Sequence, residues 1–316
     1  MNGGSTVQDL HTSRCFCCGA RAFVPIENGW IKCTWCDIQI RDGSADRCLE
    51  MADQLRAFIH SDLARDMEQT EWRLTHRTLR IAATSWGLWY DPARSMPLEI
   101  VDSTSMLNLK PIDTFSRKPL SLVVIADCES NALHDMLDRY AALFYDVIVV
   151  LDTAGPAPRN IGNVQFYSRL LDGDFGAQRN AGNALAKGEW VFHLDTDETI
   201  TPTFCKLLAP LAGAADDAAL RAVGFPRRNF VDGTVSDLFP DIQYRLMRRD
   251  VRFQNRVHER PDACNYAEQT IVSQHGTIDH FLSRDRILER SVLYDRLGQS
   301  SARHSDDRAL LRPFEP

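Results

Sequence analysis

One segment of the chain reads Asp174-Phe-Gly-Ala-Gln-Arg-Asn-Ala-Gly-Asn-Ala-Leu-Ala-Lys-Gly-Glu-Trp-Val-Phe-His-Leu-Asp195-Thr-Asp197-Glu198. Its pattern predicts a helix, a turn at a single glycine and a buried strand that carries three carboxylates at its end. Such carboxylates suit a hard divalent cation, and Mg²⁺ is usually held by one or two of them together with substrate phosphate oxygens. The segment therefore predicts a metal-assisted enzyme that acts on a nucleotide-linked or otherwise phosphorylated compound.

The residues around this segment alternate between apolar runs and amphipathic stretches. Continuous apolar runs are typical of strands buried on both faces of a parallel sheet. The expected elements are strands at 120–126, 146–151, 164–167 and 189–194 and a helix over 131–144. This alternation predicts an α/β fold with a doubly wound, mostly parallel sheet, whose ligands bind at the carboxyl ends of the strands.

Five motifs follow one another along the second half of the chain. They are Arg179-Asn-Ala-Gly182, Glu189-Trp-Val-Phe-His-Leu-Asp195-Thr-Asp197-Glu198, Tyr244-Arg-Leu-Met-Arg-Arg249, Val257-His-Glu259 and Ile278-Asp-His280. In this order they resemble the GT-A fold of nucleotide-sugar glycosyltransferases, specifically the large inverting family two. The resemblance covers about residues 119–297 and leaves the preceding part of the chain unexplained.

The resemblance implies a metal site at the end of the fourth strand. Asp195 and Asp197, two residues apart, would share Mg²⁺ or Mn²⁺ with the donor diphosphate, and the metal would neutralise the departing nucleoside diphosphate. A solvated acidic turn before the next helix is the alternative. Glu198 has a weaker case as a ligand, and the alternative is that it only positions the loop. His280 is an additional candidate metal or phosphate contact, although a lone histidine is more often structural.

Two further carboxylates are expected on the donor side. The resemblance implies that Asp152 hydrogen-bonds the nucleobase, whereas the plainer interpretation is an ordinary strand-end aspartate. Asp127 occupies the comparable position after the first strand, with Glu129 as the alternative there.

Three arginines are candidate donor-binding residues. Arg179 would face the diphosphate or the sugar, consistent with a charged fork near phosphates, unless it forms a surface salt bridge. Strand alternation places Arg245 and Arg249 on one face. They suit a diphosphate or an anionic acceptor, or else protect a strand edge.

Direct displacement at the anomeric carbon needs a base that takes the proton of the acceptor hydroxyl. Glu259 is the first candidate for this base, and His258 is the second. The competing interpretation is that both residues only order a loop over the donor.

The N-terminal region carries a cysteine pattern of a different kind. Cys15 and Cys18 form one Cys-x-x-Cys unit, and Cys33 and Cys36 form another after fourteen intervening residues. This spacing predicts a four-thiolate structural Zn²⁺ site in a zinc-ribbon-like module, with four merely reduced cysteines as the alternative. Cys17 is an alternative candidate ligand in place of Cys15 or Cys18.

Composition sets the wider limits. The chain has 316 residues, 25% of them charged, and a formal net charge of −7, which argues against a protein that coats nucleic acid. Neither a transmembrane helix nor a secretory signal is expected, so a cytoplasmic location is predicted, with peripheral membrane association left open. The expected organisation is a zinc-ribbon-like module (1–45), a helical or mixed connecting segment (46–118), a GT-A domain (119–300) and a polar, flexible tail (301–316).

Together these features predict an inverting, metal-dependent glycosyltransferase. Its donor would be a nucleoside-diphosphate sugar, with UDP expected, and its acceptor an unidentified hydroxyl on a cell-envelope glycan or another macromolecule. The ribbon would contact a protein or macromolecular partner. Two alternatives are a non-catalytic nucleotide-sugar-binding protein and a transferase that the ribbon brings to modified nucleic acid.

Overall fold

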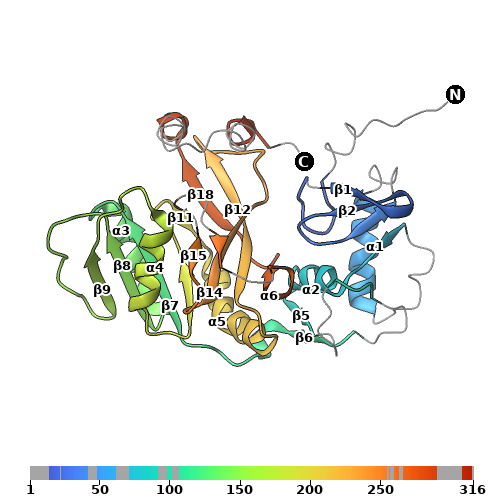
Figure 1. Cartoon of the computed structure of the whole chain (residues 1–316), viewed down its shortest axis with the longest axis horizontal. Helices are drawn as coiled ribbons and strands as arrows, with labels where there is room; N and C mark the ends of the chain where they lie inside the picture. The colour runs from blue at the N-terminus through green and yellow to red at the C-terminus, as the bar shows by residue number, and fades with distance from the viewer. Residues whose placement is uncertain are drawn as a thin grey trace. The chain divides into compact units, whose positions relative to one another are not determined.

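The chain divides into two compact units. One comprises Met1–Ile112 with Ile271–His275, and the other Asp113–Thr270 with Gly276–Pro316. The computed structural model (Figure 1) describes residues 14–21, 23–41, 48–61, 71–91, 98–101, 107–254, 256, 260–262, 266–289 and 308–314. Each unit is described by itself below.

The first unit contains the strands of the zinc-ribbon-like module. They belong to a four-stranded antiparallel sheet of β1 (Phe23–Ile26), β2 (Trp30–Cys33), β3 (Gln39–Arg41) and β4 (Trp72–Arg73). The turn η2 (Glu27–Gly29) joins β1 to β2, and Asn28 and Gly29 adopt φ values of 60° and 72° there, a conformation that Asn and Gly tolerate best.

Two helices and a hairpin complete the first unit. They are α1 (Cys48–Ser61), α2 (His76–Thr84), β5 (Leu88–Tyr90) and β6 (Leu109–Pro111). Trp72 is 2% exposed and meets the rings of Phe16 and Phe58 edge-on at 6.4 and 6.2 Å. Because Phe16 belongs to the first cysteine turn and Phe58 to α1, the ribbon and the connecting helix share one apolar core.

The second unit is built on a mixed sheet (Figure 1). Its strands are β7 (Leu120–Ala126), β8 (Asp146–Leu151), β9 (Val164–Ser168), β10 (Trp190–His193), β11 (Glu198–Thr199), β12 (Ala222–Val231), β13 (Thr234–Val235), β14 (Asp241–Arg248) and β18 (Ile278–Leu282). They follow the order β11-β18-β12-β14-β10-β7-β8-β9, with β13 paired to β12. The half from β10 to β9 is parallel, as predicted, whereas β14 runs antiparallel to both β10 and β12. The α/β class is therefore confirmed.

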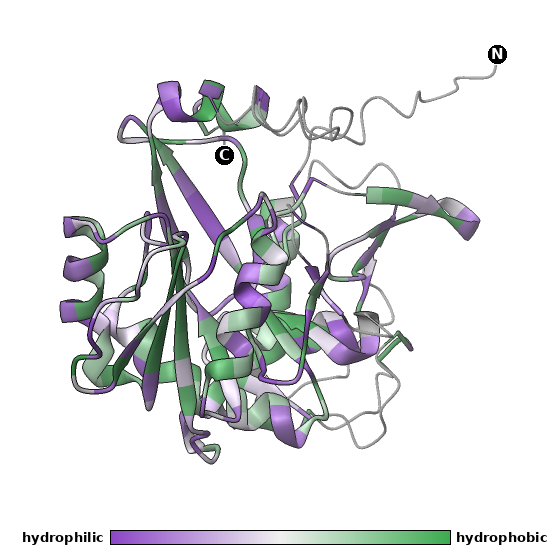
Figure 2. Cartoon of the chain, turned by 60° about the vertical axis from the view of Figure 1, so that its left-hand side comes forward, coloured by the Kyte–Doolittle hydropathy of each residue, from purple (hydrophilic) through white to green (hydrophobic). Residues whose placement is uncertain are grey.

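The helices of the second unit begin at side-chain caps. Ser130, Asp174 and Thr201 accept hydrogen bonds from the first-turn amides of α3 (Asn131–Tyr140), α4 (Phe175–Leu185) and α5 (Pro202–Asp217). The helix expected over 131–144 is thus α3 followed by the short η6 (Ala141–Leu143). Hydrophobic and hydrophilic residues alternate in stripes along the helices (Figure 2), as expected for amphipathic elements that pack on a core.

The remaining elements are short. They are η5 (Ile112–Thr114), β15 (Phe253–Gln254), β16 (Arg260–Pro261), α6 (Tyr266–Gln269), β17 (Thr270–Val272) and helical turns at 284–289 and 308–310. Within the part of the chain that the structure describes, every helix is too short or too polar to cross a bilayer.

Gly213 allows α5 to approach the chain segment before β7. A Cβ atom at this position would collide with the backbone oxygen of Ser116. Although alanine is the better helix former by about 1 kcal/mol, we expect Gly213→Ala to lower the free energy of unfolding by about 1–3 kcal/mol because the backbone cannot yield cheaply. Urea unfolding would measure this, with Thr203→Ala at an exposed position of the same helix as the control. Equal stabilities of the two variants would contradict the packing argument.

Candidate functional site

The predicted site residues gather at a cavity in the second unit. Its volume of about 480 Å³ lies within the usual range for small-molecule sites. The cavity lies at the carboxyl ends of β7 and β8, where the parallel half of the sheet was expected to bind its ligand. Seven expected site residues line it: Asp127, Asp152, Arg179, Asp195, Asp197, Arg245 and His280.

Arg249 is described by the structure but does not line the cavity. Arg249 follows the end of β14 and donates from Nη1 to the backbone oxygen of Ala186 at 2.9 Å, so its guanidinium supports the turn after α4. The candidate bases His258 and Glu259 lie outside the described residues. Arg260, the next residue in the chain, lines the cavity.

Asp195 is held by two arginines that are almost fully buried. Arg179 Nη2 lies 2.9 and 3.0 Å from its two carboxylate oxygens, and Arg245 Nη2 lies 2.7 Å from Oδ2. The side chains of Arg179 and Arg245 are 3% and 4% exposed, against 23% for Asp195. Burial by itself would raise the pKa of Asp195, but the charges of Arg179 and Arg245 outweigh it and hold this pKa well below its usual range. Asp195 is therefore an anion at neutral pH.

Glu198 lies beneath Asp195 and is fully buried. Its Oε2 accepts from the backbone N of Asp195 at 3.1 Å, while Oε1 accepts from Arg245 at 2.7 Å and from Arg227 at 3.1 Å. Arg227 also donates to Asp241 from Nε at 2.9 Å. Glu198 thus fixes the loop that carries Asp195, which is the positioning role expected for it.

Asp197 faces a second set of partners. His280 Nε2 lies 3.5 Å from Asp197 Oδ2, and Arg286 Nη1 lies 3.6 Å from the same oxygen. The other ring nitrogen of His280 is hydrogen-bonded to Asn229 Oδ1 at 2.7 Å, which orients the imidazole. The structure therefore brings together Asp197, from the loop after β10, and His280, from β18.

The two strand-end carboxylates differ in how firmly they are held. Asp152 Oδ1 accepts from the backbone N of Leu171 at 2.8 Å, so one oxygen is fixed and the carboxylate has a defined orientation. Asp127 is exposed at the end of β7, and its Oδ1 lies 3.5 Å from Cys128 Sγ.

The carboxylates that follow β10 fit a divalent cation such as Mg²⁺, most of whose ligands are phosphate oxygens and water molecules. Asp195 and Asp197 flank Thr196 at the cavity wall, and one or two carboxylates are the usual protein contribution to a Mg²⁺ site. A metal site built by the protein alone needs several His, Cys, Asp or Glu ligand atoms close together. Among the described residues, only the four cysteines form such a group of three or more, with ligand atoms within 4.8 Å of one another. Asp195, Asp197 and His280 together therefore do not form a complete protein cage.

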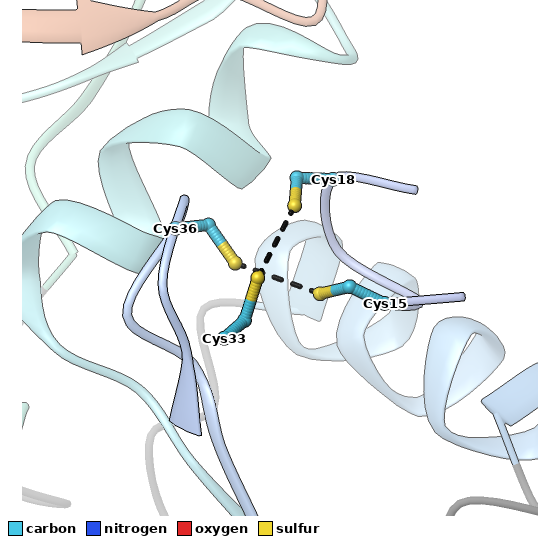
Figure 3. A group of neighbouring side chains, drawn as sticks. All are labelled: Cys15, Cys18, Cys33 and Cys36. Atoms are coloured by element: carbon cyan, nitrogen blue, oxygen red, sulfur yellow. Dashed lines mark hydrogen bonds between the residues drawn. The ribbon is translucent and has the colours of Figure 1, made fainter. Parts of the chain in front are cut away.

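The four predicted cysteines converge in the first unit (Figure 3). Cys15 Sγ lies 3.6 Å from Cys36 Sγ, and Cys18 Sγ lies 3.6 Å from Cys33 Sγ. A tetrahedron of Zn–S bonds near 2.3 Å has S–S edges of about 3.8 Å, so this buried cluster fits a structural zinc ion. Cys17 is not part of the group.

The thiols of this cluster differ in pKa. Burial raises the pKa of the Cys15 and Cys36 thiols, whereas hydrogen bonds from the other cysteines, with Cys15 contributing most, lower the pKa of Cys33. One thiolate can be held by its neighbours, but four need a metal ion.

The second cysteine turn is tied to α2. The Thr78 hydroxyl donates to the backbone oxygen of Cys36 at 2.8 Å. Asp37 adopts φ 64° and pairs with the buried Arg77, whose Nε lies 3.4 Å from Oδ2. The cysteine cluster is therefore anchored in the first unit rather than lying on an isolated ribbon.

Several site residues escaped the sequence analysis. Arg227, Asn229, Asp241 and Arg286 all contact the carboxylate cluster or its partners. The concentration of arginines over residues 227–260 was the one available signal, and it did not indicate which arginines face the site.

Comparison with known proteins does not assign a family. No protein-family model matches the chain. Solved structures of TarS from S. aureus are similar to 60% of this chain. The structure of the longer TarS chain is 15% identical in sequence and has a TM-score of 0.33, and the match covers 42% of that TarS chain. TarS 1–349 in complex with UDP-GlcNAc has 15% identity, 70% coverage of that chain and a TM-score of 0.35. The matched region thus spans less than half of the longer TarS chain.

Proposed function

We propose that this protein is a metal-dependent, inverting glycosyltransferase of the GT-A type. It would move a sugar from a nucleoside-diphosphate sugar, with UDP as the expected nucleotide, to a hydroxyl acceptor. The observation that carries the proposal is the position of Asp195 and Asp197 at the end of β10, in one cavity with Asp152 and two buried arginines.

The donor would lie along the strand ends. Asp152, fixed by the Leu171 amide, would accept from the nucleobase, and Asp127 lies at the neighbouring strand end. Arg179 and Arg245 would face the diphosphate, since guanidinium forks match phosphate oxygens. Their pairing with Asp195 orients them before the substrate arrives.

Asp195 and Asp197 would hold Mg²⁺ or Mn²⁺, with His280 next to Asp197. When bound, the cation supplies charge neutralisation for the leaving diphosphate. Glu259, or His258, would take the proton of the acceptor hydroxyl. A single displacement of this kind inverts the anomeric carbon.

Asp197→Ala tests the proposal most directly. We expect a loss of transfer of about 1000-fold, because several kcal/mol of charge stabilisation would be removed. The measurement is product formation and donor hydrolysis with a panel of nucleotide sugars and Mn²⁺. Asp279→Asn is the matched control, since Asp279 lies next to His280 on β18 but pairs with Arg228 at 2.8 Å. Full activity of Asp197→Ala would refute the metal assignment, and a wild-type protein that neither binds nor hydrolyses any donor would refute the proposed function.

A further inference from the structure

Polar and apolar side chains line both halves of the cavity. The half at β7, β8 and α4 holds Ile125, Leu171 and Phe175 as well as polar groups such as Asp127, Asp152 and Gln178. The half beyond Asp197 is formed by β12, β14, β18 and the C-terminal region of the chain, and an aliphatic wall lies there beside charged groups such as Arg227, Asp241 and Arg286. The wall consists of Leu238, Ile242, Leu282, Ile287 and Leu310.

Two members of this wall lie close to groups that contact Asp197. Leu282 lies on the same face of β18 as His280, because side chains two residues apart in a strand point to the same side. Ile287 follows Arg286, whose guanidinium contacts Asp197. The aliphatic wall therefore adjoins the carboxylate that we assign to the reaction centre.

Leu310 reaches the cavity because the segment 308–314 is docked on the chain before β14. The Phe314 amide donates to Val235 O at 2.8 Å, and the Asp237 amide donates to Arg312 O at 2.8 Å. The Ser236 hydroxyl adds a bond to Ala309 O at 3.1 Å. These three hydrogen bonds along a short segment fix the position of Leu310.

A second layer of contacts supports the same segment. Arg312 Nη2 lies 3.2 Å from the buried carboxylate of Asp237, and the Phe314 ring meets Phe239 edge-on at 5.9 Å. The segment is thus built into the cavity wall.

We infer that the half of the cavity beyond Asp197 binds the acceptor, that the acceptor carries an aliphatic group beside its reacting hydroxyl, and that Leu310 sets this preference. The inference rests on the proposed function, since it assigns the remaining half of the same cavity. Apolar side chains at a substrate subsite favour ligands that bury methylene groups there, by about fourfold in affinity per buried methylene.

A series of n-alkyl β-glucosides tests this inference on the full-length protein. With UDP and Mn²⁺ present, octyl glucoside below its micellar concentration should bind at least tenfold more tightly than methyl glucoside. Leu310→Ser should reduce this ratio to below threefold, and Leu310→Met should keep it. Leu288→Ser is the matched control, because Leu288 is 49% exposed and does not line the cavity.

Nucleoside-diphosphate affinity is measured alongside with each variant and with UDP, GDP and ADP. Nucleotide binding without any preference for the octyl chain, or a preference that Leu310→Ser leaves intact, would overturn this inference alone. A protein that binds none of the nucleotides would overturn the proposed function and this inference together.

Discussion

Replacing Cys33 and Cys36 by serine should strip the metal from the protein and unfold its first unit. Zinc binding to a four-thiolate site is worth about 10–16 kcal/mol in apparent free energy, more than a small sheet gains from its own core. The four sulfurs form one buried group, so loss of two ligands leaves the other two unable to hold the ion. Metal analysis should fall from one equivalent of zinc to none.

The unfolding can be followed in the full-length chain. Trp30, Trp72 and Trp89 are each at most 5% exposed in the first unit, so their fluorescence should shift to longer wavelength when the metal is lost. Amide exchange should accelerate in β1 to β3 but not in β7 and β8, because the second unit has its own core around Val123 and Ile148.

The Cys17→Ser variant tests whether this neighbouring cysteine is also a zinc ligand. Cys17 lies in the same turn but outside the converging group, so this variant should retain its zinc and its emission spectrum. Zinc retained by the Cys33→Ser, Cys36→Ser double variant, or lost from Cys17→Ser, would show that the ligand set is different.

Local patterns in the sequence predicted the parts of this protein that are local in space. The segment 174–198 forms a capped helix, a turn and a buried strand as expected, because the signals for all three lie within a few residues of one another. The spacing of the cysteines likewise predicted their convergence, since two short turns joined by a hairpin leave little freedom.

Partners that depend on strand order were not predictable in this way. Arg245 reaches Asp195 because β14 pairs antiparallel with β10, with Arg248 opposite Trp190, and no local pattern specifies that register. Arg245 was expected to face a phosphate, and the structure shows that it is first the counter-ion of Asp195.

The end of the chain is a similar case. Residues 308–314 fall in the expected flexible tail, yet they pair with the segment around Ser236, a partner 73 residues away from Ala309. No local pattern in the sequence marks this contact, because it is made mainly by backbone groups that every residue carries.

Asp195→Ala should lower the free energy of unfolding by about 3 kcal/mol, a second large effect. Removing one partner of a buried ion pair costs about 3–5 kcal/mol, because the remaining charge stays buried without compensation. The lower end applies here, since Arg245 keeps Glu198 while Arg179 loses both of its bonds to Asp195. Asp195→Asn, which keeps hydrogen-bond acceptors but not the charge, should fall between wild type and Asp195→Ala. Urea unfolding at neutral pH measures all three.

The stability difference between wild type and Asp195→Ala should depend on pH in a definite direction. The pKa of Asp195 is lowered by folding, so its contribution is fully present above the unfolded value of about 3.9 and is lost as the pH falls through the lower native value. The difference between wild type and Asp195→Ala should therefore be constant near neutral pH and shrink in acid. Asp250→Ala is the matched control, because its pair with Arg221 is exposed and worth at most about 1 kcal/mol. Equal losses for Asp195→Ala and Asp250→Ala, or a wild-type difference that grows in acid, would show that the buried arginines do not depend on Asp195.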